Sequence, residues 1–178
     1  MHKNIQTIYQ ETIAFAALKH GNQKMPTGLP YVVHLSNVAM EVFMAHKKEP
    51  NFNIELAIQL ALLHDVLEDT PLSFKELEDT FGNIVATGVL ALTKNASLDK
   101  KDQMQDSLAR IVKQGKEVAI VKLCDRITNL QKPPLKWNKE KIKKYHLQAV
   151  VIAQALGGKN SYLDNRIQEK IKAYTAFV

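Results

Sequence analysis

The segment 54–69 carries the side chains best suited to chemistry. Residues 60–63, just before its polar end, are all apolar, which is typical of a buried helix. Four ionisable residues then end the segment, namely His64, Asp65, Glu68 and Asp69. Such groups are costly to bury unless they are paired or bind a cation, and residues four apart share a helix face. The pattern predicts a metal site with a neighbouring general base, while a solvated helix end before Thr70-Pro71 is the alternative.

A further carboxylate, Asp125, lies within the apolar stretch 118–130. A buried carboxylate needs a partner. Lys122 lies about one turn before it and Asn129 one turn after it, so a ligand, a cation and an amide could face one cavity. A buried salt bridge between Asp125 and Arg126 is the alternative interpretation.

His34 is the third contributor, at the start of an apolar helix directly after the Gly- and Pro-containing loop 21–30. A lone histidine in this position is more often a core or surface side chain than a metal ligand. Because His34, the His64-Asp65 pair and Asp125 occur in one chain, the metal site becomes the favoured interpretation.

The elements that must position these residues are all helical. Gly, Pro and Asn residues divide the chain into helical segments, and strand-like alternation is nearly absent. We therefore predict an all-α bundle of about eight or nine helices that forms one domain over residues 1–178. The expected helices cover residues 4–19, 31–47, 53–69, 73–82, 83–93, 98–114, 116–130, 138–156 and 161–177.

Composition restricts the class of protein. The single cysteine, Cys124, excludes an internal disulfide framework and a multi-cysteine zinc site, and no signal or membrane-spanning segment is visible, so we expect a cytoplasmic protein. The net charge of +6 favours anionic partners. Nucleic acid is the less favoured partner because the lysine runs contain no interleaved aromatic residues and resemble solvated helix faces. The sequence allows an oligomer.

Four segments, in order along the chain, resemble the HD-domain phosphohydrolases of the RelA/SpoT type, most closely the stand-alone small alarmone hydrolases that include the metazoan SpoT homologue. These segments are Ala14-Phe15-Ala16 with His20 and Gln23, then Gly28 to His34, Leu62 to Thr70, and Lys122 to Leu130. The resemblance implies one divalent metal, usually manganese, held by residues matching His34, His64, Asp65 and Asp125. It also implies that Glu68 and Asp69 position and deprotonate the attacking water.

The activity that the resemblance implies is removal of the 3′ pyrophosphate from guanosine tetra- or pentaphosphate. Residues matching Asn129 and Tyr145 lie near the nucleotide in the relatives. Lys24, Lys122 and Arg126 are candidates for neutralising the polyphosphate. The expected substrate contacts are therefore Lys24, Thr27, Lys122, Arg126, Asn129 and Tyr145.

The chain departs from the family pattern in the loop after Gln23, where Met25-Pro26 replaces a basic pair whose arginine stacks on guanine in the relatives. The usual proline after the first metal histidine is Leu35. The change at Met25 leaves open a phosphatase of the same chemistry that acts on another purine alarmone, NADPH or a different nucleotide. A nucleotide-binding module without catalysis is the alternative from another class.

Overall fold

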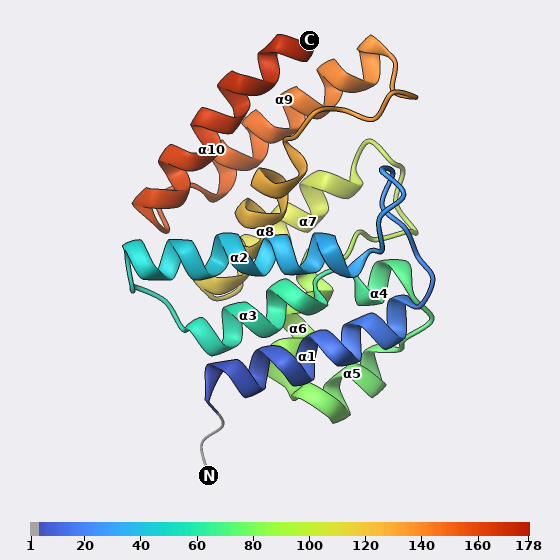
Figure 1. Ribbon diagram of the computed structural model, residues 1–178, viewed down its shortest axis with the longest axis vertical. Coiled ribbons are helices and arrows are strands. Elements are labelled where there is room, and N and C mark those ends of the chain that lie inside the picture. The colour runs from blue at the N-terminus through green and yellow to red at the C-terminus, as the bar shows by residue number, and fades with distance from the viewer. Residues whose placement is uncertain (1–3) are drawn as a thin grey trace.

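Helices dominate the computed structural model, which describes residues 4–178 (Figure 1). This confirms the all-α prediction. Residues 4–178 form no strand, and an isolated bridge joins Lys24 to Pro30. The helices are α1 (Ile5–His20), α2 (Val32–Lys48), α3 (Ile54–Leu63), α4 (Val66–Asp69), α5 (Phe74–Phe81), α6 (Asn83–Leu92), α7 (Gln103–Val112), α8 (Lys116–Asn129), α9 (Lys139–Leu156), α10 (Ser161–Tyr174) and a final 3-10 turn, Thr175–Phe177.

Side-chain caps fix several of these helix starts. The side chain of Asn53 accepts a hydrogen bond from the backbone N–H of Leu56, and Asn4, Asn138 and Asn160 cap their helices in the same way. Ser73 and Glu76 form a capping box at the start of α5. Gly82 follows α5 with a φ of 84°, a left-handed value that a side chain would oppose.

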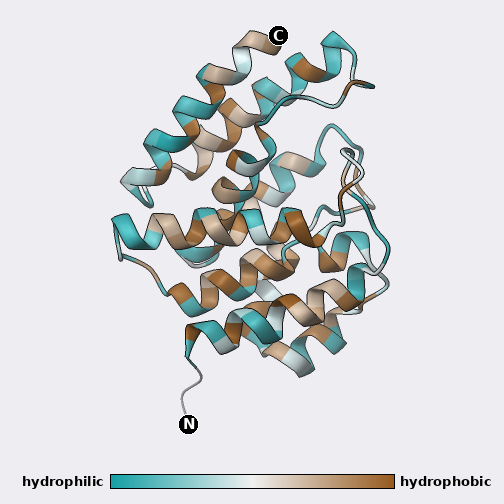
Figure 2. Ribbon diagram, in the orientation of Figure 1, coloured by the Kyte–Doolittle hydropathy of each residue, from teal (hydrophilic) through white to brown (hydrophobic). Residues whose placement is uncertain are grey.

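Helix α3 is the centre of the bundle, packed against α1, α2 and α8. Its hydrophobic colouring continues nearly all round the ribbon (Figure 2), and residues 60–63 are all fully buried. Helix α8 packs on α3 from one side and on α9 and α10 from the other, so it joins the two parts of the bundle (Figure 1). Residues that approach one another at the ends of α3 and α8 are therefore held by the core.

The prediction of one helix over 53–69 is wrong, because the chain leaves the helix at His64-Asp65 and begins the short helix α4 at Val66. Asp65 has φ −107° and ψ −1°, outside the regular helical range. The expected start at Leu98 of the helix over 98–114 is also wrong, since residues 98–102 are non-helical and α7 begins at Gln103. Within residues 4–178, none of the helices combines the length and apolarity that crossing a bilayer requires.

Candidate metal centre and catalytic site

Three buried residues from three helices converge on one point. His34 lies in the first turn of α2, His64 directly follows α3, and Asp125 lies in α8, with exposed fractions of 3%, 3% and 7%. The Nε2 atoms of His34 and His64 are 3.3 Å apart, and the Asp125 Oδ1 atom lies 3.4 Å from His34 Nε2 and 3.9 Å from His64 Nε2. One ligand atom from each residue lies within 4.8 Å of the others, which is the arrangement of a metal site.

The backbone of α3 orients His64. Its Nδ1 atom lies 2.8 Å from the carbonyl oxygen of Ala61, so Nδ1–H donates there and Nε2 faces the cluster. Burial alone would lower the pKa of His64, but the charges of Asp65 and Asp125 and the hydrogen bonds to Asp65 and Ala61 raise it to about 9. The metal-free cluster therefore holds a proton where a cation would lie.

Asp65 joins the cluster from the break between α3 and α4. Its Oδ2 atom lies 2.9 Å from His64 Nε2 and 3.9 Å from His34 Nε2, and it accepts a hydrogen bond from the Tyr31 hydroxyl. Burial opposes the charged carboxylate, but His64 and the Tyr31 hydrogen bond hold the pKa of Asp65 below its usual range. Asp65 is therefore an anion that can share a cation with both histidines.

Asp125 has the partners expected from its helix. Lys122 Nζ lies 3.1 Å from Asp125 Oδ2, and the Asn129 amide donates to Oδ1. Burial would raise the pKa of Asp125, but Lys122 and the neighbouring histidines hold it well below its usual range. The interpretation of Asp125 as half of a salt bridge with Arg126 is not supported, since the recorded ion pairs of this carboxylate are with Lys122, His34 and His64.

Glu68 and Asp69 lie on α4 and have different partners. Glu68 Oε1 lies 2.5 Å from Lys94 Nζ, and Glu68 Oε2 also accepts from the Lys94 backbone N–H at 3.1 Å. Asp69 Oδ2 accepts from the Gln23 amide at 2.8 Å, and Gln23 Oε1 in turn lies 2.7 Å from His20 Nδ1. Because α3 ends at Leu63, Glu68 and Asp69 reach the site from the separate short helix α4, in which the Asp69 backbone N–H donates to the Asp65 carbonyl oxygen at 2.9 Å.

A cavity of about 420 Å³ lies over the cluster. Five of the six residues expected to bind the metal or the water line this cavity. The sixth, His64, is buried and does not line it. Its lining residues are Met25, Pro26, Tyr31, His34, Asp65, Glu68, Asp69, Lys94, Lys122, Asp125, Arg126, Asn129, Tyr145 and Gln148.

The expected substrate contacts divide into two groups. Lys122, Arg126, Asn129 and Tyr145 line the cavity, but Lys24 and Thr27 do not. Thr27 instead lines a neighbouring groove of about 740 Å³, which shares Pro26 with the cavity. The Arg126 guanidinium lies 4.1 Å from the centre of the Tyr145 ring, a cation–π distance.

The sequence interpretation gave no role to four polar residues of the site, namely Gln23, Tyr31, Lys94 and Gln148. Gln23 and Tyr31 lie in the segments that carry the family resemblance, so their positions were a usable signal. Lys94 and Gln148 have no such signal. Lys94 belongs to a lysine run that resembles a solvated surface, and only the folded chain brings it to Glu68.

The cluster fits a divalent metal. Two imidazoles and two carboxylates converge without a thiolate, and His64 directs a ring nitrogen at the shared space through its bond to Ala61. Four buried or half-buried ionisable groups this close need a cation among them. Beside the cluster, two more carboxylates lie within the same cavity. The arrangement is suited to hydrolysis of a phosphate ester.

Comparison with known proteins gives the same family as the resemblance seen in the sequence. The guanosine-3′,5′-bis(diphosphate) 3′-pyrophosphohydrolase of Danio rerio is 33% identical over 175 residues, covering 95% of each chain. The enzyme of the same name from Homo sapiens is 30% identical over 168 residues, covering 91% of this chain and 92% of the relative. A solved structure described as a metazoan orthologue of SpoT that hydrolyses ppGpp superimposes with a TM-score of 0.81, at 29% identity, over 97% of both chains.

The family model described as the HD domain matches residues 12–149. That span includes His34, the His64-Asp65 pair and Asp125, the residues that converge in the structure. The match covers well over half of the chain and agrees with the relatives in sequence and in fold. The chain is a phosphohydrolase of the HD-domain family.

Proposed function

We propose that this protein hydrolyses the 3′ pyrophosphate of guanosine-3′,5′-bis(diphosphate), with one divalent metal held by His34, His64, Asp65 and Asp125. The observation that carries the proposal is the convergence of these four residues at a cavity that is also lined by two acid–base candidates, Glu68 and Asp69. The relatives from Danio rerio and Homo sapiens are named for the hydrolysis of this substrate.

A bound divalent ion supplies Lewis-acid chemistry, because it lowers the pKa of a coordinated water from about 15.7 toward 7 and withdraws charge from a phosphoryl oxygen. Glu68 and Asp69 face the same cavity and can orient a water and take its proton. Gln23 fixes the Asp69 carboxylate, and Lys94 fixes that of Glu68. Lys122 and Arg126 line the cavity as cations for the phosphate oxygens.

The ligand chemistry supports manganese as the metal, since imidazole and carboxylate ligands without sulfur suit a hard or borderline divalent ion. The lone buried Cys124 takes no part in the cluster, which is consistent with a protein of the reducing cytoplasm. We therefore propose manganese as the bound metal and the cytoplasm as the location of the protein.

The test is product analysis with manganese-loaded protein and guanosine-3′,5′-bis(diphosphate). We expect pyrophosphate and guanosine 5′-diphosphate from the wild type, and a rate at least about 100-fold lower from Glu68→Gln or Asp69→Asn. Asp79→Asn is the matched control, because Asp79 is an exposed carboxylate on α5 paired with Lys75. Absence of pyrophosphate release by the metal-loaded wild type would refute the proposal.

A nucleotide phosphatase with the same machinery is the second candidate, and Met25 is the observation that favours it. Met25 lines the cavity at the position where the family resemblance leads us to expect a basic side chain for the base, and methionine offers no such cationic contact. In that case NADPH or another nucleotide monophosphate ester would release orthophosphate faster than the alarmone releases pyrophosphate.

A further inference from the structure

Among the residues that the structure describes, Arg126 is a buried cation without a counter-ion. It is 8% exposed, and its Nε and Nη1 atoms have no hydrogen-bond partner within residues 4–178. The nearby lysines have carboxylate partners, since Lys94 pairs with Glu68 and Lys122 pairs with Asp125. Arg126 forms an ion pair with neither carboxylate. The contact with the Tyr145 ring is worth only about 0.5–2 kcal/mol, less than the desolvation of an unpaired cation. The unpartnered nitrogens of Arg126 are therefore suited to bind an anion.

A small second cavity lies beside the metal cavity and contains this guanidinium. It has a volume of about 60 Å³, several times the roughly 10–15 Å³ that one water needs. Lys94, Lys122, Arg126 and Gln148 line both cavities, so the two adjoin and these four side chains lie between them. We call this second cavity the annex.

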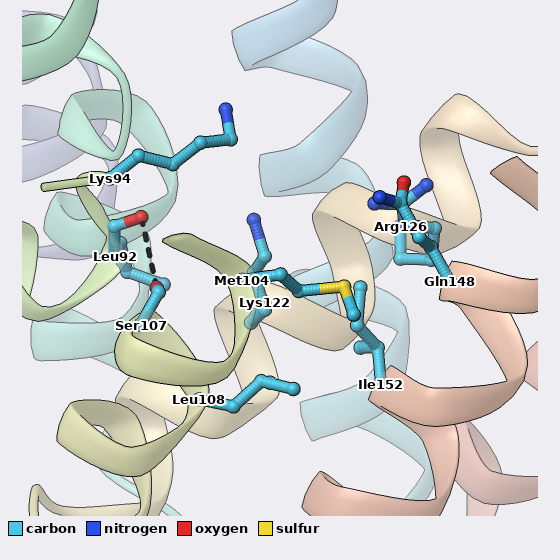
Figure 3. A pocket seen from close by; sticks show the side chains of 9 residues that line it. All are labelled: Leu92, Lys94, Met104, Ser107, Leu108, Lys122, Arg126, Gln148 and Ile152. Carbon is cyan, nitrogen blue, oxygen red and sulfur yellow. Dashed lines mark hydrogen bonds between the residues drawn. The ribbon is translucent and has the colours of Figure 1, made fainter. Parts of the chain in front are cut away.

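The side chains of the annex divide by polarity. In Figure 3 the nitrogen atoms of Lys94, Lys122 and Arg126 lie along one side, whereas Leu108 and Ile152 lie on the opposite side. Three cationic groups and one amide thus surround a space closed by apolar side chains. Charge-assisted hydrogen bonds from such groups are the usual means of holding a phosphate. The annex is too small for a nucleoside and is suited to a single phosphoryl group.

We infer that the annex binds the distal phosphoryl group of the 3′ pyrophosphate and thereby makes the enzyme prefer pyrophosphate esters to monophosphate esters. The inference rests on the proposed function and assigns the annex as the binding site of the terminal phosphate of that substrate. In the reaction, the water oxygen bonds to the proximal phosphorus, the bond from that phosphorus to the 3′ oxygen breaks, and the 3′ oxygen takes a proton. The distal phosphoryl group stays joined to the proximal one throughout and leaves with it as pyrophosphate.

The test compares two substrates that differ only in the distal phosphate. They are guanosine-3′,5′-bis(diphosphate) and guanosine 5′-diphosphate 3′-monophosphate, and the readout is the ratio of their kcat/KM values with manganese-loaded protein. Arg126→Met should lower this ratio roughly 10- to 100-fold, because charged hydrogen bonds to one phosphate are lost. Arg126→Lys keeps the charge and should restore part of the ratio. Arg166→Met is the matched control, since Arg166 is paired with Glu41 away from the site.

A binding measurement separates this inference from the proposed function. Inorganic pyrophosphate is titrated calorimetrically into metal-free protein, and Arg126→Met should weaken its binding at least about 10-fold while Arg166→Met does not. If the wild type is inactive on both nucleotides, the proposed function fails, and this titration alone decides whether the annex binds phosphate. An unchanged kcat/KM ratio, or equal pyrophosphate binding by wild type and Arg126→Met, would overturn the inference.

Discussion

Replacing Arg126 with methionine should stabilise the metal-free, substrate-free protein. The change removes two buried nitrogen atoms that lack hydrogen-bond partners, and each such group costs about 1–3 kcal/mol. It also removes the contact with the Tyr145 ring, which returns about 0.5–2 kcal/mol. With the middle of each range, about 4 minus about 1 kcal/mol, the difference is a gain of about 3 kcal/mol in the free energy of unfolding, since methionine retains much of the apolar side-chain contact and Lys122 still pairs with Asp125.

Thermal unfolding in the presence of a chelator measures this effect. For a chain of this length, about 1 kcal/mol corresponds to roughly 2–4 °C, so the Tm of Arg126→Met should rise by at least about 2 °C. Arg166→Met is the opposite case, because its removal leaves the mostly buried carboxylate of Glu41 unpaired and should lower the Tm. A Tm for Arg126→Met that falls as far as that of Arg166→Met would show that Arg126 is a structural cation, and the reasoning about an anion site at Arg126 would be wrong.

Three further predictions concern the cluster and the core. Burial lowers the pKa of His64, but its neighbouring carboxylates raise it to about 9, above the unfolded value of about 6.5. The protonated imidazole thus stabilises the metal-free fold fully below about pH 6.5, and this contribution is lost as the pH rises through about 9. Manganese must displace that proton, so the affinity of the protein for manganese should fall about tenfold per pH unit below pH 9. Calorimetry in buffers of different ionisation enthalpy should detect the released proton. A manganese affinity that does not change with pH would contradict this prediction. Burial raises the pKa of the Cys124 thiol, so the native protein should resist iodoacetamide at pH 8 and react after unfolding, and rapid native labelling would disprove the burial. Gly88→Ala places a Cβ 2.6 Å from Leu60 Cδ2 in the core. The overpacking should cost about 1–3 kcal/mol and outweigh the helix-propensity gain of about 1 kcal/mol, so the free energy of unfolding should fall. A higher denaturation midpoint for the variant would show that the core accommodates the methyl group.

The fold was predictable where local signals decide the helix ends. Ser73 with Glu76, and the asparagine caps at residues 53 and 138, mark helix starts within one residue of those observed. The break at His64-Asp65 has no such signal, because Val66 and Leu67 continue the apolar pattern and no Gly or Pro intervenes. At the break, His64 contacts His34 of α2 and Asp125 of α8, which are distant from it in sequence.

The candidate site was predictable in its composition but not in its connections. Buried ionisable residues in apolar segments identified His64 and Asp125, and the structure brings them together with His34. Lys94 could not be found in this way, since its pairing with Glu68 joins residues 26 positions apart through the packing of α4 against α6. Likewise, nothing local indicates that Lys24 lies outside the cavity lining while Met25 lies within it.

The early end of α3 also has an electrostatic consequence. Aligned peptide dipoles leave a partial negative charge of about half an electron at the C-terminus of a helix, where the last carbonyls lack intrahelical partners. One of these carbonyls, that of Ala61, accepts from His64, so the negative pole of α3 lies beside the metal cluster. A helix continuing to Asp69 would carry its terminus six residues, or roughly 9 Å, further along the axis. By ending at Leu63, the backbone itself adds negative potential at the point where the cation is expected to bind.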